Sequence, residues 1–201
     1  MSQRHDHFAI FPPDLLLQAY SQGLFPMAME SGELGWFSPD PRGIIPIHEF
    51  HVPHGMKKLL AESPFEIRIN TAYTTVMKGC ANRDTTWIND TILRSYVRLH
   101  ELGYAHSVEA WQGNTLAGGL YGVALGGAFF GESMFSKVSG ASKFALHALV
   151  QRLKARGYML LDTQWVTGHL RMFGAHEIPR RDYLVRLHRA LKLVCRFVDD
   201  P

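Results

Sequence analysis

Hydrophobic positions in the middle of the chain alternate with polar ones, which is the period of a β-strand. Phe65, Ile67 and Ile69 show this alternation at the start of the regular region. Short apolar runs follow at 104–111, 115–125 and 128–135, separated by the turn sequences QGN and GG. These runs and turns predict an antiparallel meander. A last strand is predicted at 158–165.

Four other segments show helical spacing of their apolar residues. They cover 71–81, 93–102, 141–156 and 180–191. Asn89 or Asp90 is expected to cap the second, which Gly103 ends, and Gly157 ends the third. An apolar stripe on the third is typical of a helix packed on a core, and the alternative is the wall of a ligand pocket. The stripe consists of Leu146, Leu149, Val150 and Leu153.

Residues 1–50 differ from the rest, because they are rich in Pro, Gly and aromatic residues and show little sustained period. We expect them to form a small N-terminal domain, and residues 51–201 to form a larger one. The larger domain reads as helices, a meander, then helix, strand and helix. This order predicts an α+β or mixed α/β fold with a central, largely antiparallel sheet and a crossover helix, as in acyl-transfer folds related to N-acetyltransferases.

Composition narrows the class of protein. The 201 residues are 46% hydrophobic and 19% charged, which is typical of a globular chain. The net charge of +3 allows a local basic patch for nucleic acid without requiring one. Cys80 and Cys195 are too few for a disulfide framework, so they favour a reducing cytoplasm.

Two segments bear on targeting and membranes. The N-terminus, MSQRHDHFAIFPP, lacks the apolar core of a signal sequence. The segment between Glu109 and Glu132 carries no charge and resembles a membrane span. Its seven glycines from Gly113 to Gly131 and its acidic flanks favour packed strands instead. We therefore expect no membrane partner.

Two carboxylates lie in predicted strands that are otherwise apolar, where an unpaired buried charge is costly. Alternation places Glu132 on one face with Phe130 and Met134, and Asp162 on one face with Gln164. One interpretation is that Lys, Arg or backbone amides satisfy both acids and the acids only hold the sheet together. The other is that they form a functional pair on neighbouring strands.

Motifs that would bind a phosphate-containing cofactor are incomplete or missing in the sequence. KVSGAS places Lys137, Gly140 and Ser142 at a helix N-terminus, where free backbone N–H groups can hold a phosphate. The full RxxGxG pattern expected for the pyrophosphate of coenzyme A is not present. The sequence also contains no GxSxG motif and no P-loop. We expect no cofactor.

Three histidines recur at every third position. His48, His51 and His54 would suggest a metal site, but Pro53 breaks the regular backbone between the last two. No cysteine or HExxH motif accompanies them. Surface histidines are therefore the interpretation we favour, and no metal is expected.

Nine blocks in one order carry a resemblance to a known family. They are YSQGLFPM (20–27), WFSPDPRG (36–43), TWI (86–88), LHELGYAHSVEAW (99–111), GGLYGVALGG (118–127), FGESMFS (130–136), SGASKFAL (139–146), LLDTQ (160–164) and EIPRRDY (177–183). The chain resembles the bacterial leucyl/phenylalanyl-tRNA–protein transferases over nearly its whole length. The resemblance implies transfer, in the cytoplasm, of Leu or Phe from aminoacyl-tRNA to proteins that begin with Arg or Lys, which marks those proteins for degradation. It also implies a small N-terminal domain on a C-terminal domain of the acetyltransferase (GNAT) type.

Site residues follow from the same resemblance. Glu132 and Gln164 are implied to be the central polar residues, and Asp162 the partner that orients Gln164. Trp36 and Trp87 are implied to contact the aminoacyl-adenosine end of the tRNA. The pocket for the transferred side chain is implied to include Leu120, Phe129, Gly131, Met134, Leu149, Leu153 and Leu161.

Three departures leave details of this pocket open. The family pattern allows aromatic residues where Leu149 and Leu153 stand and a second Trp where Phe37 stands, so the preference between Leu and Phe is not fixed. Strict alternation would also separate Phe129 from Met134. Both can face the ligand only if the strand contains a bulge, which we expect near the glycine between them.

The implied reaction suits these residues. An aminoacyl ester is already activated, so amide formation needs no ATP, metal or covalent intermediate. Gln164 cannot be a base because its amide is neutral, so we expect it to orient the attacking amine. Glu132 is expected to bind an ammonium group, and to accept a proton if burial raises its pKa. An acidic surface beside the site is expected to select an N-terminal Arg or Lys, with Asp162 as the first candidate; the sequence leaves open which acid does so.

Basic residues are candidates for contacts to acceptor-stem phosphates, although solvated surface charge is the other interpretation of each. They are Lys57, Lys58, Arg83, Lys137, Arg152, Lys154 and Arg156. Two other functions remain open. A coenzyme A-dependent N-acetyltransferase would share the fold, and a non-catalytic RNA-binding module would use the basic and aromatic residues. A monomer is the expected state.

Overall fold

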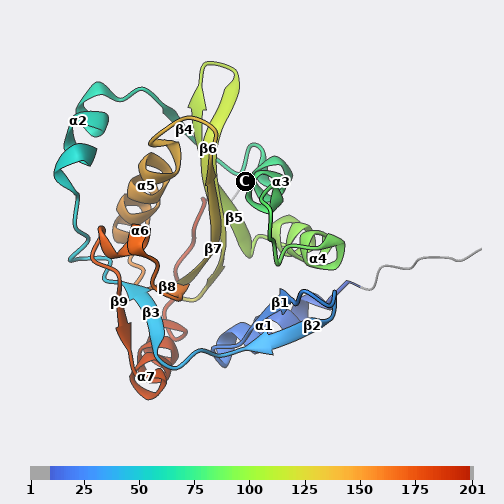
Figure 1. Cartoon of the computed structure of the whole chain (residues 1–201). Coiled ribbons are helices and arrows are strands. Elements are labelled where there is room, and N and C mark those ends of the chain that lie inside the picture. Colours follow the sequence, from blue (N-terminus) through green and yellow to red (C-terminus); the bar gives the residue numbers. More distant parts are fainter. Residues whose placement is uncertain (1–9, 200–201) are drawn as a thin grey trace, which may run out of the picture.

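The structure, a computed structural model, describes residues 10–199. Residues 1–9 and 200–201 lie outside this range, and with them most of the N-terminal stretch on which the targeting prediction rests. The described chain has a mixed α/β fold built on a seven-stranded sheet with the order β4-β5-β6-β7-β8-β3-β9 (Figure 1). The predicted fold class is confirmed.

The sheet is antiparallel except for one pair of strands. β4 pairs with β5, and β5, β6 and β7 pair in chain order and form the predicted meander. β8 lies parallel to β7, and β3 pairs antiparallel with both β8 and β9. The strands are β3 (Arg42–Ile45), β4 (Glu66–Ile69), β5 (Ala105–Gln112), β6 (Thr115–Leu125), β7 (Ala128–Ser136), β8 (Leu160–Gln164) and β9 (His176–Ile178).

Helices cover both faces of this sheet (Figure 1). On one face α5 connects the parallel strands β7 and β8, because a parallel pair needs a crossover, and α2 packs beside it. On the other face lie α3 and α4, with α1 against α4. The helices are α1 (Pro13–Ser21), α2 (His54–Glu62), α3 (Tyr73–Ala81), α4 (Asp90–Glu101), α5 (Ala141–Ala155), α6 (Gly168–Arg171) and α7 (Arg180–Ala190).

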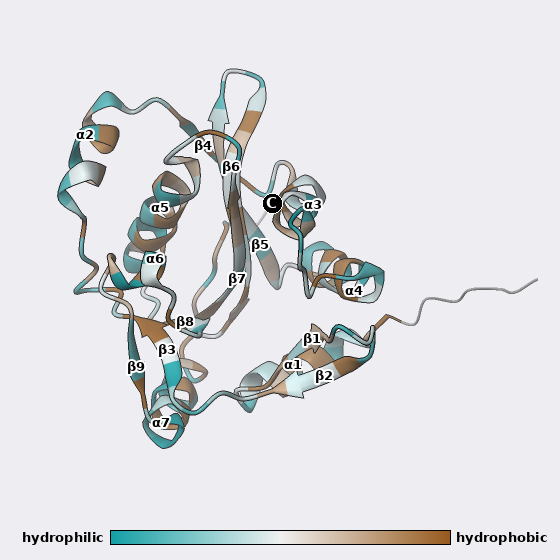
Figure 2. Ribbon diagram, viewed as in Figure 1, coloured by the Kyte–Doolittle hydropathy of each residue, from teal (hydrophilic) through white to brown (hydrophobic). Residues whose placement is uncertain are grey.

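The two faces bury two separate hydrophobic clusters. The helices show both hydrophilic and hydrophobic sides, whereas the central strands are mostly hydrophobic (Figure 2). Phe130 on β7 belongs to the cluster under α3 and α4, and its neighbour Phe129 to the cluster under α5. Side chains of successive strand residues point to opposite faces, so adjacent aromatic residues anchor both layers.

The N-terminal segment forms a small unit of one helix and one hairpin. α1 is followed by a hairpin of β1 (Phe25–Ala28) and β2 (Leu34–Phe37), which forms a separate two-stranded sheet. The next strand, β3, belongs to the large sheet although it lies within residues 1–50. The predicted boundary at residue 50 stays a prediction, but the large sheet begins before it in the chain.

Local sequence signals account for the long elements. Asn89 caps α4 by accepting a hydrogen bond from the N–H of Ile92 at 2.9 Å, and Gly103 follows the helix with a φ of 82°. α3, α5, α7 and the strands of the meander lie where their periodicity predicts. The apolar segment between Glu109 and Glu132 forms strands, and no helix within residues 10–199 has the length and apolar character of a membrane span.

A bulge shifts the register of β7. Tyr121 on β6 pairs with Ser133, but the next residue, Gly122, pairs with Gly131, so Glu132 has no partner on β6. A Cβ at Gly122 would collide with the carbonyl oxygen of Phe130, so only glycine fits this close approach. The bulge was expected on the condition that Phe129 and Met134 share a face. They do share one, since both pack in the cluster under α5.

Because of this bulge, the face predicted from strict alternation along β7 is wrong. We predicted that Glu132, Phe130 and Met134 share a face, but Phe130 and Met134 pack in different clusters on opposite faces. The extra residue turns the remainder of the strand over, because side chains alternate with a period of two. The bulge therefore places a carboxylate between two core layers.

Candidate active site

A cavity opens where two neighbouring strands stop pairing. β7 and β8 pair from Ala128 and Leu160 to Phe130 and Asp162, and both strands continue beyond that point. β7 stays with β6, and β8 stays with β3. The cavity beyond the last pair has a volume of about 340 Å³.

The cavity has an apolar part and a polar part. Its apolar lining comes from β6, β7, α5 and β8 and includes Leu120, Met134, Leu146, Leu149 and Leu161. Its polar lining includes Glu132, Gln164 and Thr163, and Phe25, Met27 and Trp87 close it on the side of the small hairpin. Such a mixture is typical of a site that binds an apolar group and does chemistry next to it.

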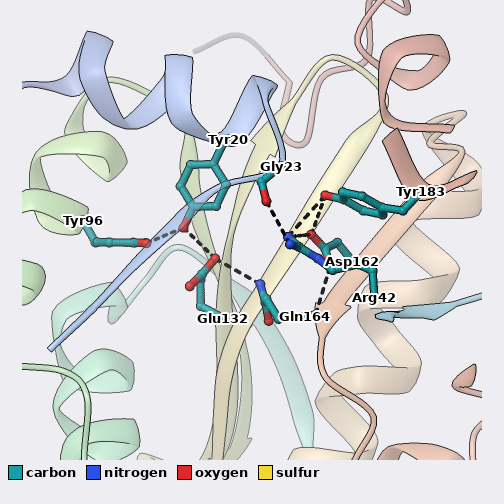
Figure 3. A network of polar contacts seen from close by, with 8 residues as sticks. All are labelled: Tyr20, Gly23, Arg42, Tyr96, Glu132, Asp162, Gln164 and Tyr183. Carbon is teal, nitrogen blue, oxygen red and sulfur yellow. Dashed lines mark hydrogen bonds and ion pairs between the residues drawn. The ribbon is translucent and has the colours of Figure 1, made fainter. Parts of the chain in front are cut away.

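Glu132 is held by a tyrosine from the N-terminal helix (Figure 3). The hydroxyl of Tyr20 donates to Oε1 of Glu132 at 2.7 Å, and the hydroxyls of Tyr20 and Tyr96 are hydrogen-bonded to each other. Gln164 Nε2 makes a longer contact of 3.5 Å to the same oxygen. No Lys or Arg within residues 10–199 forms an ion pair with this carboxylate.

The environment of Glu132 changes its ionisation. Burial raises its pKa to about 8; the Tyr20 hydrogen bond works in the opposite direction, and the nearby Asp162 adds to the rise. The residue keeps some exposure through the cavity, so water there weakens the desolvation and a bound substrate strengthens it. A carboxyl with a pKa near neutrality can both take up and release a proton under physiological conditions.

Asp162 is in a different environment, although it lies on the adjacent strand. It is fully buried, and Arg42 from β3 donates from Nε to its Oδ1 at 3.0 Å and from Nη2 to its Oδ2 at 2.6 Å. The hydroxyl of Tyr183 donates to the same Oδ2 at 2.7 Å. These bonds occupy both oxygens, so Asp162 has no free face for an incoming Arg or Lys, contrary to the expected role (Figure 3).

Asp162 does hold Gln164, but not in the way we expected. Its Oδ1 accepts a hydrogen bond from the backbone N–H of Gln164 at 2.8 Å, and no bond joins it to the side-chain amide. Gln164 has a φ of 59°, which is rare for a residue other than glycine. The strand end is therefore locked in an unusual conformation that turns the amide toward the cavity, and such strain is often found at functional sites.

The structure brings most of the predicted site residues together, but not all. Glu132, Gln164, Trp87, Leu120, Gly131, Met134, Leu149 and Leu161 line the cavity. Phe129 and Leu153 are fully buried beneath it in the cluster under α5 and do not line it. Trp36 lies on β2, partly exposed against Phe11, and does not line it either.

The predicted basic residues fall into two groups. Lys57 and Lys58 are exposed on α2, which packs against the start of α5 near the exposed Lys137. Arg83 lines the cavity and donates to the carbonyl of Met134 at 3.1 Å. At the end of α5, by contrast, Arg152 binds the Phe197 carbonyl and Arg156 forms an ion pair with Asp199, while Lys154 lies between them.

The start of α5 is less open to a phosphate than its sequence suggests. Ser136 Oγ accepts the N–H of Ser142 at 2.9 Å, and the carbonyl of Val138 accepts the N–H of Ala141 at 3.1 Å. The chain itself thus uses the first two N–H groups of this helix. His48, His51 and His54 are exposed, and within residues 10–199 no group of three or more His, Cys, Asp and Glu is arranged to hold a metal.

Four residues of the network were missed by sequence reasoning. They are Arg42, Tyr20, Tyr96 and Tyr183, which contact the two carboxylates directly or through one hydroxyl. All but Tyr96 lie inside blocks that were already noted, WFSPDPRG, YSQGLFPM and EIPRRDY. A polar residue in such a block was the available signal, but nothing in the sequence said which carboxylate it meets.

Comparison with known proteins places the chain in a family. The family model described as leucyl/phenylalanyl-tRNA protein transferase matches residues 44–188, and the model of its N-terminal domain matches residues 10–40. A protein named leucyl/phenylalanyl-tRNA–protein transferase from Gloeobacter violaceus is 51% identical over 186 residues, 92% of this chain and 96% of its own. One of the same name from Akkermansia muciniphila is 52% identical over 185 residues, 90% and 96% of the two chains.

Proteins with this name are aminoacyltransferases that use tRNA, and the protein is an enzyme of that class. The chain belongs to the leucyl/phenylalanyl-tRNA–protein transferase family. A solved structure titled "The structure of L-PGS from Bacillus licheniformis" also matches, with a TM-score of 0.40, 12% identity, and coverage of 78% of this chain and 57% of that one. A likeness at that level carries no weight for fold or function.

Proposed function

We propose that this enzyme transfers Leu or Phe from aminoacyl-tRNA to the α-amine of proteins that begin with Arg or Lys, and so creates an N-terminal degradation signal. The family supports the tRNA and protein substrates in general terms. The single observation that supports the reaction is the cavity in which Glu132 and Gln164 meet an apolar recess. A location in the cytoplasm stays a prediction.

The apolar recess suits the donor. Leu120, Met134 and Leu149 surround it with the methyl and thioether groups of flexible side chains. Full burial of a Leu or Phe side chain contributes about 1.5 to 3 kcal/mol. A branch at the β-carbon, as in Ile or Val, widens the side chain next to the backbone and would clash there, so shape would reject it.

The polar end suits amide formation. The α-amine attacks the ester carbonyl, the bond from that carbon to the ribose oxygen breaks, and the ribose oxygen leaves as a hydroxyl once it receives the proton that the amine has lost. The amine gives up a proton in this step, and Glu132 is the acceptor we propose, because its raised pKa lies close to that of an α-amine. Gln164 orients the amine through its carbonyl oxygen, since a neutral amide cannot take the proton.

Asp162 acts as a positioning residue in this scheme. It fixes Gln164 through a backbone N–H, and its charge is balanced by Arg42 within the protein. This arrangement holds the amide of Gln164 in place without a flexible partner, so the orientation is set before substrate arrives.

The tRNA would lie along the basic residues that are exposed near α2 or line the cavity. Lys57, Lys58, Lys137 and Arg83 are the proposed contacts to phosphates, and Trp87 the proposed contact to the terminal adenosine. Phosphate contacts release counterions, so binding should weaken steeply as salt rises. A flat salt response would argue against this surface.

The decisive test uses charged leucyl-tRNA and a peptide that begins with Arg, followed by mass spectrometry. We expect a gain of one leucine residue at the amino end of the peptide. Glu132→Gln should lower the single-turnover rate about 100-fold or more with saturating substrates, since general base catalysis contributes that much. An unchanged rate would remove Glu132 from the chemistry.

The same experiment separates the rival functions. A coenzyme A-dependent acetyltransferase would bind coenzyme A in calorimetry and would leave the leucyl-tRNA intact. An RNA-binding module would bind tRNA without changing the peptide. The start of α5 already argues against coenzyme A, because its first two backbone N–H groups are in use.

A further inference from the structure

The proposed reaction leaves one recognition problem unsolved. A preference for N-terminal Arg or Lys needs a negative charge that faces the acceptor, but Asp162 is paired with Arg42 and fully buried. Glu132 is engaged with Tyr20 and is assigned to the proton. The selecting acid must therefore lie elsewhere around the site.

A second cavity lies next to the first. Its volume is about 290 Å³, and its walls come from the segment that joins β2 to β3, from the end of β8 and from β9. Asp40 and Glu177 are its acidic residues, and both are exposed. The remaining lining residues are Phe37, Ser38, Pro39, Pro41 and Trp165.

Trp165 joins the two cavities. It lines both of them, is 44% exposed, and directly follows Gln164 in the chain. Its ring meets Phe25 edge to face at 5.3 Å, and Phe25 stacks with Phe37 at 6.3 Å. A continuous aromatic wall therefore runs from the reaction site into the second cavity.

The charges around the second cavity leave room for a cation. Within residues 10–199, Glu177 forms no ion pair, and Asp40 accepts one hydrogen bond, from the N–H of Arg180 to its Oδ1 at 3.0 Å. The guanidinium of Arg180 donates to the carbonyl of Ser38 at 3.1 Å and contributes a positive charge nearby. Two carboxylates and one guanidinium leave a net charge of −1.

We infer that the second cavity is the subsite for the basic side chain of the acceptor, with Asp40 and Glu177 as the selecting acids and Trp165 as the surface along which its stem lies. The inference rests on the proposed function, since it names the residues that choose the acceptor. In this arrangement the α-amine of the acceptor lies at Gln164, and the side chain of its first residue lies along Trp165, the next residue in the chain.

The chemistry of Lys and Arg fits this surface. Their long aliphatic stems pack on apolar surface while the charged head stays in water, and a cation over an indole ring is favourable. The exposed indole of Trp165 can receive the aliphatic stem, and the carboxylates of Asp40 and Glu177 lie beyond it for the charged head. A neutral or acidic side chain gains nothing from the carboxylates, so the subsite discriminates by charge.

The test compares two peptides that differ only in their first residue, Lys or norleucine, because norleucine keeps the stem and lacks the ammonium. The variant is Asp40→Asn with Glu177→Gln. Asn retains an oxygen for the N–H of Arg180, so the start of α7 keeps its hydrogen bond. Glu30→Gln with Glu49→Gln is the matched control, which removes two exposed acids from outside the cavity.

We expect the ratio of kcat/KM for the Lys peptide to that for the norleucine peptide to fall about five- to tenfold in the variant, through KM and not kcat. The control should keep the wild-type ratio. Glu177→Lys should lower the ratio further, because it places a like charge in the subsite.

An unchanged ratio in both Asp40→Asn/Glu177→Gln and Glu177→Lys would overturn the inference while transfer itself continues. A ratio that falls equally in the control would overturn it too, since a long-range charge effect would then explain the preference. If the wild-type enzyme transfers leucine to neither peptide, the proposed function fails first and the inference with it.

Discussion

Glu132 and Asp162 lie on adjacent strands of one sheet, yet their surroundings differ in almost every respect. Asp162 is fully buried and accepts four hydrogen bonds, two of them from Arg42. Glu132 borders a cavity and has tyrosine and glutamine as its partners, with a pKa of about 8. The same functional group thus forms a buried ion pair at one position and lies close to its protonation midpoint at the other.

The difference shows how the fold divides two tasks. A buried carboxylate with a guanidinium partner is a fixed element of structure, because moving either partner leaves an unpaired charge. A desolvated carboxylate without a cation can change its protonation state at modest cost. The first therefore holds Gln164 in place, and the second is suited to proton transfer.

Removal of Arg42 gives the largest expected effect. Arg42→Met leaves Asp162 buried without its cation and should lower the free energy of unfolding by about 3 to 5 kcal/mol. Urea unfolding measures the change. The double variant Arg42→Met/Asp162→Asn should recover much of the loss, since it also removes the buried charge, and a loss below about 1 kcal/mol in the single variant would show that the pair is not desolvated.

The pH dependence of stability isolates Glu132. A carboxyl whose pKa is higher in the folded state binds its proton more tightly there, so its contribution to stability is complete below pH 4.5 and is lost as the pH rises to about 8. We expect the stability of the wild type relative to Glu132→Gln to fall by about 2 to 4 kcal/mol between pH 4.5 and 8.5. A difference that stays constant with pH would mean that Glu132 titrates alike in both states.

Loss of one hydroxyl should shift the pH profile of transfer. Tyr20→Phe removes the donor that favours ionised Glu132, so the pKa of Glu132 should rise by about one unit. The rising limb of the single-turnover rate against pH should move to higher pH by the same amount. Tyr158→Phe is the control, because the Tyr158 hydroxyl is buried without a partner in the described chain, and an equal shift there would discount the result.

The smallest effect is expected at an ion pair with the same chemistry on the surface. Arg156 donates to both oxygens of Asp199 at 2.7 and 2.8 Å, but Asp199 is exposed. Water screens such a pair, so Asp199→Asn should leave the midpoint of urea unfolding unchanged within error. A loss comparable with that of Arg42→Met would show that burial is not the cause of the contrast.

The long elements were predictable because they bury one face over many residues. β6 spans Thr115–Leu125, which is the predicted segment, and α3 and α5 lie where their spacing places them. The first 50 residues and α2 were not resolved by periodicity, since frequent Pro and Gly interrupt the pattern and keep the elements short. Strict alternation also failed to predict which face the residues after the β7 bulge point to, because one inserted residue reverses the direction of every later side chain.

The candidate site was predictable in part. The motif blocks located Glu132, Gln164 and most of the apolar lining, since those residues lie within the blocks themselves. Phe129 and Leu153 were placed in the pocket but pack beneath it, because a strand or helix position gives a face and not a depth. The role expected for Asp162 failed for a different reason: its partner lies far away in the chain.

The local order of apolar and polar residues by itself determined the meander, the crossover helix and the family to which the chain belongs. Only the tertiary structure decided which acid is paired with a cation and which borders the cavity, because Arg42 reaches Asp162 across 120 positions of sequence. Ionisation depends on the water and charges within a few ångströms, and these are set by packing between distant segments.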